Sequence, residues 1–403
     1  MRRSPTHAPR RGAVALIVLV SLVVILMLVA LAVDYAGLWE ARGAMENAAD
    51  AAALSAAADL VDDRALLASP PVQVALIQNA RADAVAYAAN NLVLGQPLPL
   101  DPNPTNDPAG DLVFGFVDLL QGTGFIAAGD VSDPTNPNVL AVNAVRVVAR
   151  RTRARGNPAG LRLGRWLSTP SADVVAAATA LLDRDVIGFR STAGQSLPVV
   201  PIALLSDPTG ANPLGWEAQA ANGPDAFQFD RVSRTFSAGS DGLREVQVQL
   251  AQNGCLLEAG VITVVDASAQ VVAGVAPAQA PDGIILGPSN TLLAMTFPGC
   301  GPAPDTADAA TLQAALAQLQ ATGDVRVWPL YQSVDAGSGT AVLTGFVAAR
   351  VAAVAAPAAG QPVTFTLQPG ELATATAVTD ATRRGVGGIN IVNPYVCKIR
   401  LVE

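Results

Sequence analysis

The ionisable and nucleophilic side chains of this 403-residue chain offer few combinations that suit catalysis. The single histidine, His7, lies in a basic N-terminal tail, which excludes Ser-His or Cys-His pairs and histidine metal centres elsewhere in the chain. The single lysine, Lys398, suits a solvated charge at a strand end better than the base of a Ser-Lys dyad. Acidic pairs such as Asp62-Asp63 are typical of surface charge. We therefore predict no catalytic residue, no small-molecule substrate and no enzymatic activity.

One stretch has the spacing of a metal site. Residues 261–270 read VITVVDASAQ and place Asp266 and Ser268 directly after a predicted strand. This resembles the Asp-x-Ser-x-Ser start of the metal-ion adhesion site in von Willebrand A domains, where oxygen ligands bind a hard divalent cation. Gln270 replaces the last serine of that motif, and no parallel βαβ succession follows. We favour an ordinary exit from a strand and predict no metal site and no cofactor.

The chain has three cysteines, Cys255, Cys300 and Cys397, and none has a partner at CxxC spacing. In an oxidising compartment, one pair can form a disulfide and leave one thiol over. We predict the pair Cys255–Cys300, since both residues stand in glycine-flanked turns. Three buried free thiols are the alternative.

Residues 13–33 form an apolar run in which Ser21 is the only side chain that can form a hydrogen bond. As a helix, the run is roughly 31 Å long, which matches the hydrocarbon core of a bilayer. The tail, residues 1–12, contains four arginines and no acid, so we expect it in the cytoplasm. Tyr35 and Trp39 follow the run, where aromatic rings settle at a membrane interface. We predict a single-pass protein of the inner membrane, with the bilayer as its first partner and its bulk outside the cytoplasm.

A cleaved signal peptide is the alternative to a retained anchor. Ala30-Leu31-Ala32 is an acceptable cleavage site, and the basic start also fits a signal peptide. The apolar run, however, exceeds the usual length of about 7–15 residues, and helix-forming sequence continues through the site. We therefore predict a permanent anchor.

The net negative charge argues against polyanionic partners. The net charge is −8, and removing the four arginines of the tail leaves −12 for residues 13–403. Such an acidic ectodomain has no electrostatic reason to bind nucleic acid or anionic lipid headgroups.

Two helices are predicted between residues 34 and 94. The first, residues 34–68, carries a stripe of small and apolar side chains that either packs on its own domain or meets another helix. Its members are Leu38, Ala41, Met45, Ala48 and Ala52. Ser69-Pro70-Pro71 ends this helix, and residues 72–94 form the second. The stripe of the second helix is Leu76, Ile77, Ala80, Ala84 and Tyr87. Residues 95–111 are a Pro/Asn-rich linker.

From residue 112 to residue 403 the apolar period changes to two, which predicts a β-rich region with room for two subdomains. The predicted strands are residues 111–118, 141–151, 171–182, 196–205, 244–251, 260–266, 325–334, 345–355 and 363–370. One inserted helix is predicted at residues 306–323, with Asp305 or Thr306 as N-cap and Leu312, Leu316 and Leu319 inward. The predicted fold class is α+β: a transmembrane helix, an Ala-rich helical region and a β-rich ectodomain.

The N-terminal region has a familiar layout. Gly12 precedes the apolar run, Asp34 follows it, and residues 47–54 read NAADAAAL. This arrangement resembles the Tad-type N-terminal region of TadE/TadG-like pilus-assembly proteins. Looser resemblances occur at residues 145–148, 171–180 and 197–204 and in the segment from Trp328 to residue 354.

The resemblance implies a non-catalytic accessory protein in the assembly, anchoring or surface presentation of Flp (tight-adherence) pili. It also implies adhesion and partners among pilus-assembly or envelope proteins. Pilins cut by a prepilin peptidase usually have a glutamate five residues after the processed glycine, whereas Ile17 occupies that position here. A pseudopilin-like subunit of a secretion or pilus apparatus is therefore the alternative, and a von Willebrand A-like metal-dependent adhesin is a more distant one.

Overall fold

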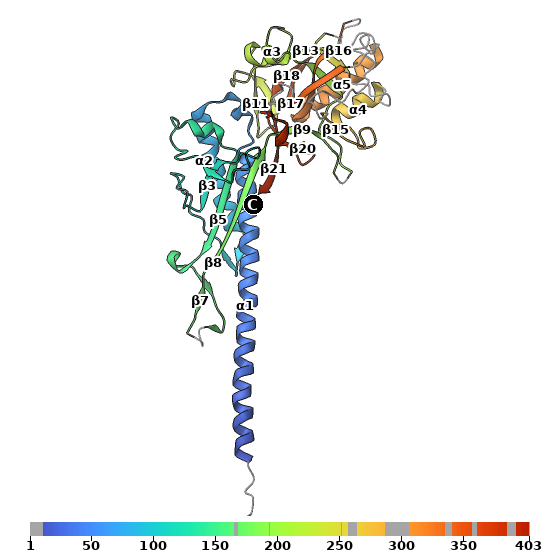
Figure 1. Ribbon diagram of the computed structural model, residues 1–403. Helices are drawn as coiled ribbons and strands as arrows, with labels where there is room; N and C mark the ends of the chain where they lie inside the picture. The colour runs from blue at the N-terminus through green and yellow to red at the C-terminus, as the bar shows by residue number, and fades with distance from the viewer. Residues whose placement is uncertain are drawn as a thin grey trace, which may run out of the picture.

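One long helix projects from two β-sheet domains and gives the molecule an elongated shape (Figure 1). The computed structural model describes residues 11–164, 168–192, 194–250, 252–256, 264–286, 306–334, 341–356, 361–384 and 392–402. The combination of a long N-terminal apolar helix with a β-rich remainder confirms the predicted α+β class.

Helix α1 (Arg11–Asp59) is continuous over 49 residues, which is consistent with the absence of proline between Ala13 and its end. The large apolar side chains from Val14 to Val33 are exposed. In the described part of the chain, α1 is the one helix long and apolar enough to cross a membrane. Its lower half is therefore built for contact with an apolar solvent.

The upper half of α1 lies in a protein core. The stripe predicted from the sequence is buried there: Ala41, Met45, Ala48 and Ala52 are all fully covered, and Leu38 is partly covered. The residues that cover it belong to α2 and to the strands of the same domain. Of the two alternatives for this stripe, the structure shows packing on its own domain.

Helix α1 ends at Asp59 and not at residue 68, because the next residues turn away from the helix axis. The 3-10 helix η1 (Asp63–Leu67) follows, and the Asp62 side chain caps it. Helix α2 (Pro70–Asn90) then packs back on α1. Leu76, Ile77, Ala80 and Ala84 are buried as predicted. Tyr87 is exposed instead, since Ala88 continues the four-residue spacing of the stripe.

The stretch predicted as a linker, residues 95–111, folds as a packed loop. It begins with the small hairpin of β1 (Leu92–Val93) and β2 (Gln96–Pro97). Asn103 and Asn106 are buried in left-handed backbone conformations, which asparagine tolerates well. The Asn106 amide binds Phe114 in both directions, donating to its carbonyl and accepting from its N–H. These asparagines attach the loop to the neighbouring sheet.

A six-stranded sheet packs against α1 and forms a domain with α1 and α2, which we call the membrane-proximal domain because it lies next to the candidate span. In spatial order its strands are β19 (Leu372–Ala373), β21 (Val396–Val402), β8 (Val174–Asp183), β5 (Ala144–Arg151), β3 (Leu112–Phe116) and β4 (Ile126–Ala127). All neighbours are antiparallel except β19 and β21. Alternate residues of β5 and β8, such as Val147 and Ala178, pack into the core that contains α1, as the period of two predicts.

Three smaller elements complete this domain. The hairpin of β6 (Ala159–Gly160) and β7 (Ser171–Ala172) extends beside α1 (Figure 1). The other two are the 3-10 helices η2 (Pro137–Ala141) and η3 (Arg153–Arg155).

The distal domain contains the second six-stranded sheet. Its strands in spatial order are β13 (Val246–Gln249), β18 (Thr364–Pro369), β17 (Ala341–Val354), β16 (Arg326–Val334), β10 (Ile202–Leu205) and β14 (Gly254–Leu256). Only β10 and β16 pair in parallel among these neighbours. A three-stranded sheet of β15 (Ile284–Ile285), β9 (Val186–Phe189) and β20 (Ala377–Thr379) lies beside it, together with the hairpin of β11 (Phe227–Asp230) and β12 (Thr235–Ala238).

The distal domain is inserted between two strands that are neighbours in the membrane-proximal sheet. Strands β8 and β21 pair in antiparallel fashion, yet the chain builds the distal sheet between them. The chain therefore passes between the two domains several times, and these interdomain crossings lie close together.

The described residues of the distal domain include three α-helices, whereas the sequence predicted one. Helix α5 (Thr306–Thr322) is the predicted helix, with Leu312, Leu316 and Leu319 buried, and Asp305 lies outside the described residues. Helix α3 (Trp216–Asn222) was not predicted.

Helix α4 (Val264–Ala273) corrects the strand predicted at residues 260–266, of which residues 260–263 lie outside the described residues. Asp266 and Ser268 are thus within a helix and do not follow a strand, so the backbone context of the adhesion-site motif is missing. Ala267 and Val271, four residues apart, are both buried, and this helical spacing agrees with the packing of α4 on α5.

We expect substitution Ala52→Leu to lower the free energy of unfolding by about 1–3 kcal/mol, because α1 and the sheet leave no room for a larger side chain. Ala58→Leu, on the exposed face of the same helix, is the matched control and should change it by less than about 0.5 kcal/mol. Thermal unfolding of the detergent-solubilised full chain, followed by circular dichroism, measures both. Equal midpoints for the two variants would contradict the packing described here.

Candidate functional site

The aromatic residues predicted at the membrane interface, Tyr35 and Trp39, lie on one side of α1 just beyond its apolar half. Their side chains are 60% and 61% exposed, and their ring centroids are 6.1 Å apart in an edge-to-face arrangement. Together with Leu38 and Val174–Val175 of β8 they border a shallow groove of about 270 Å³. Exposed aromatic rings at this height fit the interfacial position predicted for them, which stays a prediction.

Asp34 is the first charged residue after the apolar half of α1, and its carboxylate is buried. It accepts hydrogen bonds from the backbone N–H groups of Arg162, at 2.7 Å, and Leu163, at 3.0 Å. These residues belong to the loop between β6 and β7, so Asp34 attaches this hairpin to α1. The sequence singled out Asp34 by resemblance alone, and its partner, 128 positions away, left no local signal.

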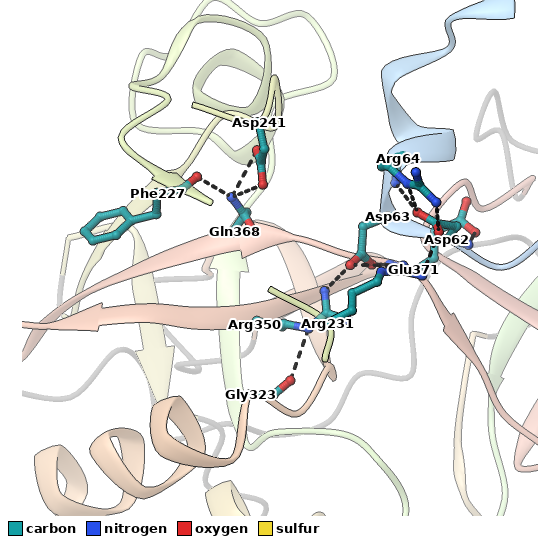
Figure 2. Close-up of polar contacts among 10 residues, drawn as sticks. All are labelled: Asp62, Asp63, Arg64, Phe227, Arg231, Asp241, Gly323, Arg350, Gln368 and Glu371. Carbon is teal, nitrogen blue, oxygen red and sulfur yellow. Dashed lines mark hydrogen bonds and ion pairs between the residues drawn. The ribbon is translucent and has the colours of Figure 1, made fainter. Parts of the chain in front are cut away.

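The segment that follows α1 meets the distal domain through a cluster of charges (Figure 2). Asp62 accepts from the Arg64 guanidinium, with Nη2 at 2.9 Å, and from Nη1 of Arg231 at 2.6 Å. Burial alone raises the pKa of Asp62, but the hydrogen bonds and charges of Arg64 and Arg231 outweigh it and lower that pKa. Asp62 is therefore ionised and tied to the turn between β11 and β12.

Asp63 makes the deepest contact of this cluster. Its carboxylate forms a buried ion pair with Arg350 of β17 and accepts the backbone N–H of Glu371 at 2.7 Å. The Arg350 guanidinium lies 4.2 Å from the centroid of the Phe229 ring and donates to the Gly323 carbonyl at 3.1 Å. The charge of this buried arginine is matched by Asp63, and its Nε and Nη1 groups both donate hydrogen bonds.

Two of the chain crossings between the domains also enter this cluster. Arg184 lies between β8 and β9, and its Nη2 is 3.0 Å from Glu371, which lies between β18 and β19. The Glu371 carboxylate also accepts the backbone N–H of Asp62 at 3.1 Å. We call the set Asp62, Asp63, Arg184, Arg231, Arg350 and Glu371 the junction cluster. It connects the end of α1, two interdomain crossings and the distal sheet.

The junction cluster corrects the prediction that Asp62 and Asp63 are surface charges. Both are buried, because their partners come from parts of the chain up to 309 positions away. Gln368 supports the same region from β18, donating to the carbonyl of Phe227 at 3.0 Å and to the Asp241 carboxylate (Figure 2). No pattern in the sequence marks Arg184, Arg231, Arg350 or Glu371, because an isolated charge in a strand or turn does not indicate its partner.

Glu371 is the group of the junction cluster whose pKa is raised to near neutral pH. Burial raises its pKa to about 7, against the opposing effect of Arg184. It borders a groove of about 680 Å³ between the two domains, which Leu60, Arg184 and Tyr395 also line. The groove gives the carboxylate a route for proton exchange with solvent.

The remaining predicted residues lie apart from the junction cluster. Cys255 is in β14 and is disulfide-bonded, whereas Cys397 is a buried free thiol whose pKa burial raises to about 12. Cys300 lies outside the described residues, so its pairing with Cys255 stays a prediction. Lys398 lies within β21 and donates to the carbonyl of Ala377 at 3.1 Å.

Among the described residues, no group of three His, Cys, Asp or Glu side chains is arranged to hold a metal ion. The carboxylates of the junction cluster are bound to arginines and to backbone N–H groups. This arrangement is suited to holding two domains in a fixed orientation.

We expect Asp63→Asn to destabilise the protein by about 3–5 kcal/mol, because it leaves the buried Arg350 without its counter-charge. Asp282→Asn, which changes an exposed aspartate of the distal domain, is the matched control. Thermal unfolding of the full chain compares the two. A midpoint for Asp63→Asn that equals the control would show that the pair does not hold the domains together.

The raised pKa of Glu371 predicts a pH-dependent stability. Between its ordinary value of 4.5 and about 7, the folded protein keeps a proton that the unfolded chain has released. Stability should therefore fall as the pH rises through this range, by up to roughly 3 kcal/mol. In Glu371→Gln this part of the fall should disappear. Unfolding midpoints measured from pH 4.5 to 7.5 test it, and the same slope in both proteins would contradict the assignment.

Comparison with known protein families gives a match that covers the N-terminal helix. A search of curated proteins and a search of solved structures each found no match to the chain. The looser resemblances beyond residue 60 lie outside the matched residues and stay predictions. The matched segment ends at the last residue of α1 and includes Asp34, Tyr35 and Trp39. Residues 12–59 match the family described as putative Flp pilus-assembly TadE/G-like, so the N-terminal region of this chain is a Tad-type region and relates the protein to Flp pilus assembly.

Proposed function

We propose that this protein is a non-catalytic accessory protein of Flp/Tad pili, anchored in the inner membrane with its N-terminus in the cytoplasm. In this role it assists the assembly, anchoring or surface presentation of the pilus, and so adhesion. The observation that carries the proposal is the single continuous helix α1, which serves both as candidate span and as core of the membrane-proximal domain. Because the helix that would span the membrane is also part of the domain core, the membrane would fix the position of the ectodomain.

The proposed mechanism is mechanical. If residues 13–33 cross the bilayer, the remaining 26 residues of α1 extend about 39 Å beyond it. The junction cluster then transmits the orientation of α1 to the distal sheet through Asp63 and Arg350. The distal domain would thus be held away from the membrane at a defined angle, where envelope or pilus-assembly proteins reach it.

The absence of catalysis is part of the proposal. It is supported by the positions of the carboxylates, since Asp62 and Asp63, the acidic pair noted in the sequence, are each bound by an arginine. A carboxylate neutralised in this way is a poor general base.

A pseudopilin-like subunit is the second candidate, and one observation favours it. The exposed apolar half of α1 projects from the domain over its whole length, so it can pack against the same helix in other copies. Ile17, in place of the glutamate usual in processed pilins, argues for the anchored accessory protein.

The mature N-terminus separates the candidates. We expect mass spectrometry of the protein from its native envelope to find an intact start, and alkaline carbonate to leave the protein in the membrane. A start at Ala13 would support the subunit, and a start after Ala32 would support a cleaved signal peptide. Either result would overturn the anchor.

The role in pili needs a test in cells. We expect deletion of the gene to reduce surface pili and adhesion, and expect the full chain to restore them. The matched control is residues 34–403 exported behind a cleavable signal, which keeps the ectodomain but removes the span. Normal piliation in the deletion strain would overturn the proposed role, and full rescue by the released ectodomain would overturn the need for anchoring.

A further inference from the structure

The groove between the two domains, which Glu371 borders, is large enough to hold a ligand. Its volume of about 680 Å³ falls within the range of roughly 300–1,000 Å³ that is usual for binding pockets. Its lining comes from η1, the start of α2 and η2 in the membrane-proximal domain, and from Leu243 and helix α3 in the distal domain. An occupant of this groove would therefore touch both domains.

Most of the side chains that line the groove are apolar. Leu60, Leu182 and Leu243 are buried, whereas Leu67 is half-buried and Leu140 is 46% exposed. Exposed and buried leucines in one hollow form a surface that gains free energy when an apolar partner covers it.

One polar side chain of the groove has hydrogen-bonding capacity that the protein does not use. Gln73, in the first turn of α2, lines the groove and is only 8% exposed. Its side-chain amide forms no hydrogen bond with any residue in the described part of the chain, yet neither of its polar atoms is closed off from solvent. Because a buried amide needs partners for its oxygen and its nitrogen, these must come from water or from a ligand within the groove.

The other polar side chains that line the groove have partners within the protein. Arg184 and Glu371 form an ion pair at 3.0 Å, and Arg244 donates to the Gly223 carbonyl at 2.8 Å. The Tyr395 hydroxyl accepts a hydrogen bond from an indole N–H at 3.1 Å. A charged ligand would have to displace one of these contacts, whereas an uncharged ligand would not. The groove therefore favours an uncharged, largely apolar occupant.

Primary amides elsewhere in this chain indicate what kind of occupant suits Gln73. The Gln219 amide accepts from the N–H of Gln247, on strand β13, at 2.9 Å and donates to the carbonyl of the same residue at 3.2 Å. Asn143 binds Val117 in the same two directions, at 2.9 Å and 3.1 Å. An extended residue presents its N–H and C=O groups on the same side, so one amide side chain can bind both.

We propose that the interdomain groove binds an extended, uncharged peptide segment of a partner protein, with the Gln73 amide bonded to its backbone and its apolar side chains against the lining leucines. This inference goes beyond the role in pili and concerns the ectodomain alone, so it does not depend on where α1 lies. Because the segment would contact both domains, its binding would also stabilise their orientation next to the junction cluster.

Selection from a peptide library tests the groove. The full chain in lipid nanodiscs is used to select from random octapeptides displayed on phage, and empty nanodiscs remove the peptides that bind lipid. We expect uncharged peptides with Leu, Val or Ile at alternate positions, since an extended chain turns alternate side chains toward one wall. A selection that yields no peptide, or only charged ones, would overturn the proposal and leave water as the partner of Gln73.

A substitution in α2 tests the contact with the amide. We expect Gln73→Met, which keeps the length of the side chain, to weaken binding of the selected peptides about tenfold, because two hydrogen bonds are lost. Gln78→Met, on the same helix but outside the groove, is the matched control. Fluorescence anisotropy with labelled synthetic peptides measures both. The thermal midpoint of Gln73→Met should stay unchanged, because the amide has no partner among the described residues. Equal affinities of the two variants would overturn the proposal.

A second substitution tests whether the peptide lies in the groove. Leu140→Glu places a charge in the lining and should abolish binding, whereas Leu120→Glu, at a 51%-exposed position of the same domain outside the groove, should not. Binding that survives in Leu140→Glu would place the peptide elsewhere and overturn the proposal. Self-association of the full chain that Leu140→Glu abolishes would assign the groove to a second copy. A small molecule found by native mass spectrometry and lost in Gln73→Met would assign it to that molecule. Either result would overturn the peptide.

Discussion

The packing of the upper half of α1 against the membrane-proximal sheet is the contact on which the rest of this molecule depends. Alanine at positions 41, 48 and 52 lets the strands approach the helix closely, so the helix cannot rotate or slide relative to the domain without creating voids or clashes. Apart from Ser21, residues 14–33 of the same helix present apolar side chains to their surroundings. If the lower half crosses a bilayer as proposed, the same helix fixes the orientation of the membrane-proximal domain relative to that bilayer.

The distal domain keeps a fixed orientation relative to α1 only if the connection after Asp59 is also rigid. The junction cluster supplies it with buried ion pairs whose value lies in geometry more than in net stability, since desolvation offsets much of their attraction. Such pairs tolerate few alternative arrangements. Because Arg184 and Glu371 lie on interdomain crossings, the covalent and the ionic connections occupy one place. Hinge motion there would require several charges to lose their partners together.

The helices and strands that were predicted correctly are those set by the local spacing of apolar residues. The strands around residues 112–116, 144–151 and 174–183 and the helix at 306–322 follow from alternation or from a leucine stripe. The segment at 264–273 did not, because its short apolar runs are found in strands and in helices alike, and its packing on α5 decides. For the candidate site, the sequence singled out Asp34 by its place after the apolar run and Asp62-Asp63 as an acidic pair. Their partners were not, since pairs such as Asp63 and Arg350 are 287 positions apart and lack any local signature.

The insertion of the distal domain between β8 and β21 has a consequence for biogenesis. Arg400 on β21 binds Asp183 on β8 across 217 positions, and in the orientation proposed above every residue between them must leave the cytoplasm before the two strands can meet. During export, the emerging β8 has an unpaired edge and the sheet around α1 stays incomplete. The inserted domain can form its own core in that interval, so translocation order favours folding from the outside toward the bilayer. Chaperones that shield open sheet edges would find their substrate in this window.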